Sequence, residues 1–265
     1  MLLRLYNLGM NYDNYPQNYM LAHYKLLDNR LNECPSIIIR SERGHSIYLV
    51  NNNGIRNRYR TTSPKGREYA KLYELRTTLK KELDEMAQVY SDRFGSNIEN
   101  DAATTRFTSS PRLNFDKAFF DSLKPCATTY PNNNRYFYRN VNYRSRAEMV
   151  IAQVLDEMGL TYKYDCEIIT NGITHTVDFA VYLPEFGCCF FIEYLGRLRD
   201  ERYVDDNKFK LKDYLMGGIY IGRELLILCG DDIYMPPVNV IRSEIAKMLY
   251  IITDLHTVSA RTAVR

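Results

Sequence analysis

The stretch CCFFIEYLGRLRDERY, residues 188–203, joins an apolar run to a burst of charge. Glu193 alone interrupts the apolar half, which ends at Gly196. A short apolar run bounded by a glycine is typical of a strand that is covered on both faces of its sheet. A carboxylate in such a strand costs several kcal/mol unless a proton, a cation or a metal ion compensates its charge. The sequence therefore predicts a compensating partner for Glu193.

The segments around this strand alternate between helical and extended patterns. Turn signals at Asn171-Gly172 and Gly217-Gly218 separate neighbouring segments. The patterns predict, in order, a helix over 145–159, strands over 161–169, 174–182 and 187–195, a helix over 201–216, a strand over 218–229 and a helix over 238–254. This αβββαβα order indicates an α/β (α+β) domain over 143–256 with a mixed sheet, followed by a tail over 257–265.

The first part of the chain, residues 1–142, has a different character. SIIIR (36–40) and SIYLV (46–50) predict a small β-hairpin, and apolar residues at spacings of three and four predict a long amphipathic helix over 64–93. Residues 96–142, rich in Asn, Thr, Ser and Pro, predict a loop-rich linker. Residues 1–145 hold 22 Lys and Arg against 14 Asp and Glu, whereas the remainder holds 13 against 18. The N-terminal region is therefore basic.

Aromatic residues are interleaved with this basic charge, as in RNRYR (56–60) and NRYFYRNVNYR (134–144). Such a pattern suits contact with a phosphate backbone and stacking of bases. A solvated face on which tyrosines cover apolar surface explains the same pattern equally well. The candidate nucleic-acid contacts are Arg56, Arg58, Arg60, Arg76, Lys80, Lys81 and Arg144.

Composition excludes several other classes of protein. The chain is 45% hydrophobic and 25% charged, as in an ordinary globular protein, and no stretch predicts a signal peptide or a membrane span. The six cysteines lack the CxxC spacing of zinc sites. We therefore expect a cytoplasmic protein without a membrane partner and with free thiols.

Three acidic residues have apolar neighbours. Asp178 interrupts HTVDFAVYL, Glu193 interrupts CCFFIEYL, and Glu148 lies at the start of the helix SRAEMVIAQVLDEMGL. Adjacent strands bring the first two carboxylates to the same end of a sheet, where hard oxygen ligands suit Mg²⁺ or Mn²⁺. Each residue also has a structural interpretation, since Asp178 can accept hydrogen bonds at a strand end and Glu193 can pair with Arg197 or Arg199. Glu148 is placed to close a capping box with Ser145.

A lysine on the following helix shares its inward face. At 100° per residue, Tyr203, Asn207, Lys210 and Tyr214 form one stripe, whereas Lys208 and Lys212 project to the opposite side. From this stripe the Lys210 ammonium can reach the carboxylates or a scissile phosphate. The alternatives for Lys210 are an i,i+4 pair with Asp206 or an extended side chain at the helix edge.

Together these segments resemble the restriction-endonuclease-like, PD-(D/E)XK nuclease family. The resemblance rests on SRAEMVIAQVL, YKYDCEI, VDFAVYL and FIEYLG, followed by Tyr203, Lys210, Tyr214 and GGI, and it covers about residues 140–250. It is strongest to an uncharacterised bacterial and phage branch in which E-x-x-G is followed by Y, then by K seven residues on, then by Y four further on. The implied fold is an αβββαβ core.

The resemblance also assigns roles to residues. Glu148 matches the helix glutamate, Asp178 the aspartate of the PD motif and Glu193 the acidic residue of (D/E)XK. Val177 replaces the usual proline, and Leu195 stands where the motif lysine is expected. The branch resemblance implies that Lys210 takes over from the helix, and the alternative is loss of catalytic competence.

The resulting hypothesis is a Mg²⁺-dependent endonuclease, with Mn²⁺ as a substitute, that hydrolyses phosphodiester bonds, with DNA as the favoured substrate. Asp178, Glu193 and the main-chain carbonyl of Tyr194 would bind the ion, Glu148 would hold a water of that ion or a second ion, and Lys210 would position the nucleophile. The rival hypotheses are an inactive nucleic-acid-binding module, an RNA-cleaving nuclease and a structural ion site. A homodimer or a partner subunit is expected if both strands of a duplex are cut.

Overall fold

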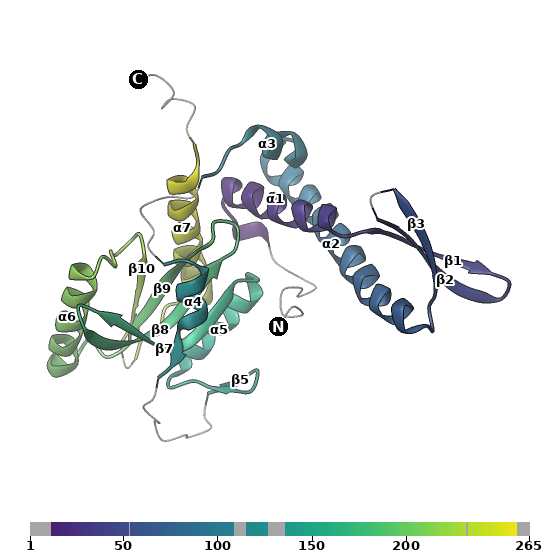
Figure 1. The fold of residues 1–265 in the computed structure, drawn as a ribbon. Coiled ribbons are helices and arrows are strands. Elements are labelled where there is room, and N and C mark those ends of the chain that lie inside the picture. The colour runs from purple at the N-terminus through teal and green to yellow at the C-terminus, as the bar shows by residue number, and fades with distance from the viewer. Residues whose placement is uncertain (1–11, 53, 109–114, 127–135, 232, 259–265) are drawn as a thin grey trace. The chain divides into compact units, whose positions relative to one another are not determined.

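The chain forms two compact units in a computed structural model, which describes residues 12–52, 54–108, 115–126, 136–231 and 233–258 (Figure 1). The smaller unit spans 20–105, and the larger unit combines 12–19 with 106–258. The sequence placed the division after residue 142, whereas the described residues between 106 and 142 group with the larger unit. Of the expected tail, only residues 257 and 258 lie within the described ranges.

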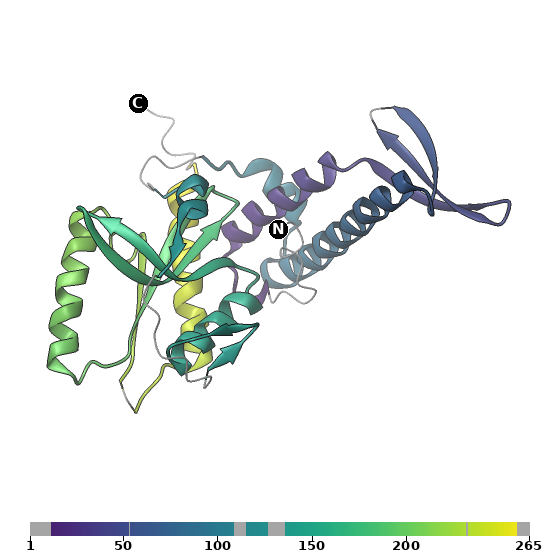
Figure 2. The same ribbon diagram turned by 60° about the horizontal axis from the view of Figure 1, so that its bottom comes forward.

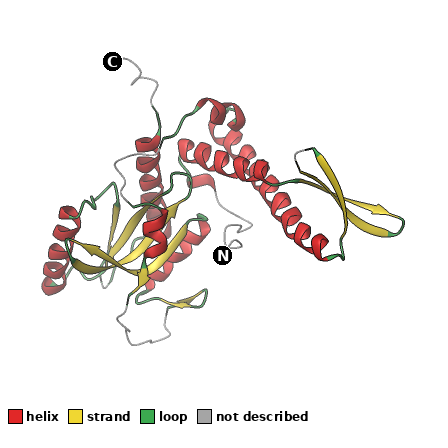
Figure 3. Cartoon of the chain, in the orientation of Figure 1, coloured by secondary structure: helices red, strands yellow, loops and turns green. Residues whose placement is uncertain are grey.

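From residue 146 onward, the larger unit has the predicted order of elements, and Figure 3 distinguishes its helices from its strands. These elements are α5 (Arg146–Glu157), β7 (Thr161–Thr170), β8 (Ile173–Leu183), β9 (Cys188–Leu195), α6 (Glu201–Met216), β10 (Leu225–Cys229) and α7 (Val238–His256). The strands lie in the order β10-β9-β8-β7-β4, where β4 is Lys124–Pro125. β10 pairs with β9 in parallel and the other pairs are antiparallel, which confirms a mixed sheet in an α/β unit.

Helices cover both faces of this sheet (Figure 2). α5 and α7 contact each other on one face. On the other face, Phe120 of α4 (Lys117–Ser122) and Tyr214 of α6 share an apolar cluster with strand residues. β9 lies second in the strand order, and all of its residues except Tyr194 are buried. Burial on both faces is the physical reason for its nearly continuous apolar sequence.

The strand predicted over 218–229 is shorter than expected. Only Leu225–Cys229 forms β10, because residues 218–224 make a turn instead. Gly218 and Gly222 adopt left-handed backbone conformations in this turn. The Tyr220 amide donates to the Glu224 carboxylate at 2.9 Å, which closes the turn.

The expected loop-rich linker over 96–142 also contains regular structure. It carries α3 (Ile98–Thr104), α4, β4 and a two-stranded hairpin of β5 (Phe137–Tyr138) and β6 (Val141–Asn142). The short helices α3 and α4 begin at Asn97 and Asp116, whose side chains accept a hydrogen bond from a backbone amide three residues on. The rest of the expected linker, residues 109–114 and 127–135, lies outside the described residues.

The smaller unit contains a sheet of three strands where the sequence predicted a hairpin. β1 (Ser36–Glu42), β2 (His45–Asn52) and β3 (Ile55–Arg60) pair in that order and are antiparallel. The sequence also gave no prediction of α1 (Gln17–Glu33), which follows a 3₁₀ helix, η2 (Tyr12–Asn14). α1 begins in the larger unit and continues into the smaller one.

The predicted long helix is confirmed as α2 (Pro64–Phe94). The Ser63 hydroxyl caps its start by accepting from the Gly66 amide at 2.9 Å, and Gly95 ends it in a left-handed conformation. Its buried face includes Leu79, Leu83, Met86 and Tyr90. Within the described ranges, no helix is both long enough and apolar enough to cross a membrane.

Candidate active site

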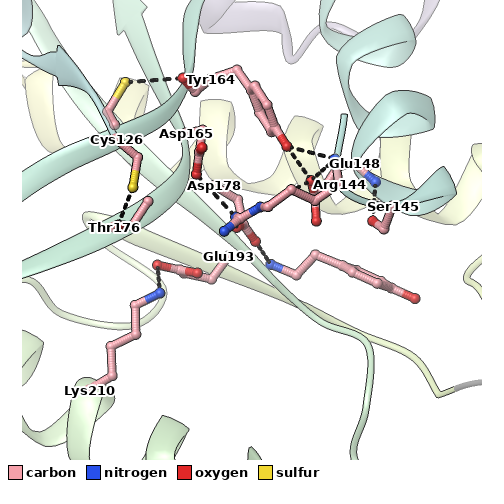
Figure 4. Close-up of polar contacts among 12 residues, drawn as sticks. Cys126, Arg144, Ser145, Glu148, Tyr164, Asp165, Thr176, Asp178, Glu193 and Lys210 are labelled. Atoms are coloured by element: carbon pink, nitrogen blue, oxygen red, sulfur yellow. Dashed lines mark hydrogen bonds and ion pairs between the residues drawn. The ribbon is translucent and has the colours of Figure 1, made fainter. Parts of the chain in front are cut away.

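A cleft of about 970 Å³ opens at one end of the mixed sheet. Its lining includes the four residues that the sequence placed in a catalytic site, Glu148, Asp178, Glu193 and Lys210. They come from α5, β8, β9 and α6, and Figure 4 shows their side chains converging. The fold therefore brings together residues that lie up to 62 positions apart in the chain.

The pairing of β8 with β9 places the two strand carboxylates side by side. The last pair of this ladder is Phe179 with Ile192, so that Asp178 and Glu193 are the next residues in register. Both are buried, with 6% and 3% of their surface exposed. One oxygen of Asp178 accepts from the backbone amide of Tyr194 at 2.7 Å. Asp178 is therefore fixed to the strand that carries Glu193.

Two side chains of α6 compensate Glu193. The Lys210 ammonium lies 2.7 Å from Glu193 Oε1, and the Tyr214 hydroxyl donates to the same oxygen at 2.7 Å. The four-residue spacing puts both on one face of the helix, as the predicted stripe requires, whereas Lys208 and Lys212 are exposed. α6 starts at Asp200, whose carboxylate accepts from the Tyr203 amide at 3.1 Å.

The simpler interpretations of Glu193 and Lys210 do not describe the structure. Arg197 pairs with Asp200, and Arg199 pairs with Asp231 at 2.9 Å, so both arginines are engaged away from Glu193. Lys210 makes its ion pair with Glu193 and not with Asp206, the neighbour one turn before it.

Glu148 combines a helix-start role with a place in the site. Its amide donates to the Ser145 hydroxyl at 3.1 Å, which is the first half of a capping box. Its carboxylate, however, accepts from the Arg144 amide at 3.1 Å and from the Tyr164 hydroxyl. In the second half of a capping box this carboxylate would accept from the Ser145 amide. Tyr164 of β7 therefore holds the Glu148 carboxylate at the cleft.

Arg144 links the acidic residues of the cleft. Its guanidinium lies 2.7 Å from Asp178, 3.3 Å from Asp165 and 3.7 Å from Glu148. The sequence suggested Arg144 as a contact for nucleic acid, but the structure places its charge among carboxylates of the same chain. Only 27% of its side chain is exposed.

Asp165, which pairs with Arg144 but is not among the residues that line the cleft, is a member of this network of ion pairs that the sequence analysis missed. It lies in the middle of β7, between the pairs that Tyr164 and Cys166 make with β8, and this register places it across from Asp178. Its φ of 54° is left-handed, a conformation that is uncommon outside glycine and concentrates at functional sites. The available signal was an aspartate inside the strand-like segment YKYDCEI.

Within the network of buried and half-buried ion pairs, carboxylates outnumber cations, whereas the exposed Arg146 and Arg197 bring further positive charge to the lining of the cleft. Four carboxylates, Glu148, Asp165, Asp178 and Glu193, face two cations, Arg144 and Lys210. Burial, and then the nearby Asp178, raise the pKa of Glu193 to about 7. Burial also raises the pKa of Glu148 and of Asp165. An additional cation would relieve this excess of buried negative charge.

The donor atoms of the site fit a hard divalent cation. Two buried carboxylates and the main-chain carbonyl of Tyr194 are oxygen ligands of the type that Mg²⁺ and Mn²⁺ prefer. Among the described residues, no three His, Cys, Asp or Glu side chains lie close enough together to hold a metal by themselves. An ion between Asp178 and Glu193 would have to compete with Arg144 and Lys210 for their oxygens.

The other predicted nucleic-acid contacts lie in the smaller unit. Arg56, Arg58 and Arg60 are exposed on β3, and Lys80 is exposed on α2. Arg76 instead donates to the carbonyls of Leu31 and Cys34 at 3.0 and 3.2 Å. Lys81 pairs with Glu85 at 3.3 Å. Of these six residues, Arg76 and Lys81 are therefore bonded to other residues of the chain, and the remaining four are exposed.

Comparisons of the chain with protein-family models, with curated proteins and with solved structures return no significant match. The chemistry of the cleft must therefore be argued from its own geometry and from the sequence motifs.

Proposed function

We propose that the protein is a metal-dependent endonuclease that hydrolyses phosphodiester bonds, with DNA as the favoured substrate. One observation carries the proposal: two buried carboxylates from adjacent strands share a cleft with a helix lysine whose ammonium lies 2.7 Å from one of them. Oxygen ligands beside a fixed cation are the arrangement that hydrolysis of a phosphodiester requires.

The architecture supports the same proposal. The order α5-β7-β8-β9-α6-β10, with antiparallel strands followed by a parallel one, is consistent with the αβββαβ core that the motif resemblance implies. Leu195 stands where the family motif has its lysine, and it is buried in β9. Lys210 reaches Glu193 from α6, so a lysine from the helix can serve where the strand has none.

A Mg²⁺ or Mn²⁺ ion held by Asp178, Glu193 and the Tyr194 carbonyl would supply Lewis-acid activation of water and neutralise charge on the phosphate. The chain's own groups do the rest. Lys210 orients the attacking water and stabilises charge that develops on the phosphate oxygens. Tyr214 holds Glu193 in place through its 2.7 Å hydrogen bond. Glu148, whose carboxylate accepts from the Tyr164 hydroxyl, would accept a hydrogen bond from a water in the cleft.

A catalytically silent nucleic-acid-binding module is the second candidate. It is favoured by the ion pairs that Arg144 and Lys210 make with the strand carboxylates, because these pairs already compensate the buried charge. This candidate predicts binding that is indifferent to metal ions. Cleavage of RNA in place of DNA is a variant of the first candidate and needs only a different substrate.

One cleavage experiment separates these candidates. The purified protein is incubated with supercoiled plasmid, linear duplex, single-stranded DNA or RNA in Mg²⁺, Mn²⁺ or EDTA. We expect cleavage that requires the metal and falls by about 10²-fold or more in Asp178→Ala, Glu193→Ala and Lys210→Ala. Glu224→Gln is the matched control, because Glu224 is equally buried but pairs with Arg223 outside the cleft.

Each outcome has a distinct meaning. Loss of cleavage in all three cleft variants, with Glu224→Gln active, supports the nuclease and the role of Lys210. Full activity of Glu193→Ala would contradict the site assignment. Activity lost in Asp178→Ala but kept in Lys210→Ala would retain the metal site and remove the lysine from the mechanism. Binding of nucleic acid by wild type without any cleavage would favour the silent module.

A further inference from the structure

The three-stranded sheet of the smaller unit has one apolar face. Ile37, Tyr48 and Val50 are buried there, and Tyr59 packs with them against α2. The rings of Tyr59 and Tyr69, a residue of α2, stack at 4.8 Å between centroids. Since side chains alternate between the faces of a strand, the residues next to these in sequence point away from α2.

Four arginines occupy that opposite face. Arg56, Arg58 and Arg60 are every second residue of β3, and Arg60 and Arg40 both pair with Ile47, from the two sides of β2. We call Arg40, Arg56, Arg58 and Arg60 the arginine face. All four are exposed, whereas Ile47 between two of them is only 8% exposed.

The positive charge of the arginine face is poorly compensated within the chain. Residues 36–67 hold seven Lys and Arg and a single acidic residue, Glu42. Glu42 lies 3.6 Å from Arg58, and 40% of the Glu42 side chain and 72% of the Arg58 side chain are exposed. In the described part of the chain, Arg40, Arg56 and Arg60 form no ion pair. A surface with this charge favours an external polyanion.

The spacing and chemistry of the arginines point to phosphate. Alternate residues of a strand are about 6.6–6.8 Å apart, so the three guanidinium groups of β3 form an evenly spaced row. Guanidinium binds phosphate oxygens through two parallel hydrogen bonds. Tyr48 and Tyr59, the strand aromatics that could stack on bases, are on the other face against α2. The arginine face is therefore suited to the backbone of a nucleic acid and not to its bases.

We propose that the arginine face binds the phosphate backbone of nucleic acid, without sequence preference, as a second contact in addition to the cleft. This inference rests on the proposed function, in which nucleic acid is the substrate. It changes the set of contacts expected from the sequence by adding Arg40 and removing Arg76, whose guanidinium holds the end of α1. Phosphate contacts position a substrate, whereas base contacts would specify one.

The test measures binding without cleavage. The full chain is titrated against labelled 30-base-pair duplexes of two unrelated sequences, in EDTA and over a series of salt concentrations, with fluorescence anisotropy as the readout. The variant is Arg56→Gln/Arg58→Gln/Arg60→Gln. The matched control is Arg202→Gln/Lys208→Gln/Lys212→Gln, which removes the same charge from exposed positions on α6. Thermal melts check that both variants fold.

We expect the arginine variant to bind at least about 10-fold more weakly and to lose about 2–3 from the slope of log affinity against log salt, because each phosphate contact contributes about 0.9. The control should change affinity by less than about 2-fold, and both duplex sequences should behave alike. Unchanged affinity and slope in the arginine variant would overturn the inference, as would binding of anionic phosphatidylserine vesicles in place of DNA.

Failure of this inference is distinguishable from failure of the proposed function. A wild-type protein that binds duplex through the arginine face but cuts nothing in Mg²⁺ supports the inference and contradicts the nuclease. A protein that cuts duplex equally well with and without the three arginines, at substrate concentrations below saturation, supports the nuclease and contradicts the inference.

Discussion

The cleft and the arginine face both contain several charged side chains, but they differ in how far these charges are buried and compensated within the chain. In the cleft, carboxylates are buried and each is held by a cation, an amide or a hydroxyl of the same chain. On the arginine face, the charges are exposed, and one weak pair with Glu42 is their compensation among the described residues. Buried charge without full compensation is costly, whereas exposed charge is not.

This difference indicates what each region is suited to bind. The cleft, about 970 Å³ in volume, has buried carboxylate oxygens, which suit a compact cation together with the reacting part of a substrate. The arginine face has a row of donors on an open sheet, which suits a long polyanion. If the comparison holds, changes in the cleft should alter stability and metal binding, and changes on the arginine face should alter mainly affinity for nucleic acid.

The largest effect on stability is expected from pH acting on Glu193. Its pKa is raised from 4.5 to about 7 by burial and then by Asp178, so between these pH values the folded protein keeps a proton that the unfolded chain has lost. The free energy of unfolding therefore falls as pH rises through this window. In EDTA, we expect wild type to lose about 3 kcal/mol relative to Glu193→Gln between pH 4.5 and 8.

Urea unfolding of the two proteins at several pH values measures this loss. Addition of Mg²⁺ at pH 8 should restore stability to wild type more than to Glu193→Gln, because an ion compensates the ionised carboxylate. If the free energy of unfolding changes with pH in the same way in both proteins, Lys210 and Tyr214 already compensate the Glu193 charge in full. The proposed difference between the cleft and the arginine face would then be wrong.

A smaller effect is expected from Arg144→Met. Removal of the guanidinium leaves Asp178, Asp165 and Glu148 without their shared cation, and we expect the free energy of unfolding in EDTA to fall by about 2 kcal/mol. Mn²⁺ should bind more tightly to this variant, because it no longer competes with Arg144 for Asp178. Calorimetric titration with Mn²⁺ and thermal melts in EDTA measure both changes.

Arg139→Met is the control for this experiment, since it breaks a similar pair, 2.8 Å from Asp156, outside the cleft. It should leave Mn²⁺ affinity unchanged. Weaker binding of Mn²⁺ by Arg144→Met would mean that the guanidinium organises the carboxylates for the ion instead of competing with it.

The sequence could predict those parts of the site in which side chains follow a regular helical or strand pattern, or in which one polar residue interrupts such a pattern. Glu193 stood out because β9 is buried on both faces, and Lys210 stood out because α6 has a clear polar and aromatic stripe. The apolar residues of α2 recur every three or four positions along a long segment, and this pattern predicted the helix. In each case local sequence and tertiary environment impose the same pattern.

Other features could not be predicted because they depend on contacts between distant segments. In the sequence, Arg144 is one of several arginines in a basic segment. Only the folded chain brings it beside Asp165 and Asp178. Asp165 is opposite Asp178 only in the register that β7 and β8 adopt. The helix α1 was missed because one of its buried residues is a tyrosine, Tyr19, and the helix follows a stretch that is rich in asparagine and tyrosine. Such a composition resembles a turn-rich segment more than a helix.

The smallest expected effect, and the sharpest test of the comparison, comes from Glu42→Gln on the arginine face. The Glu42–Arg58 pair spans 3.6 Å between side chains that are 40% and 72% exposed, so its loss should change the free energy of unfolding by less than about 1 kcal/mol. The freed guanidinium should bind duplex about 2–5-fold more tightly and steepen the salt dependence. Glu85→Gln breaks an equally exposed pair with Lys81 and makes the same change in net charge. If both variants tighten binding alike, net charge and not the arginine face governs affinity. A gain confined to Glu42→Gln, without loss of stability, is what a surface built for an external polyanion requires, and no substitution in the cleft should reproduce it.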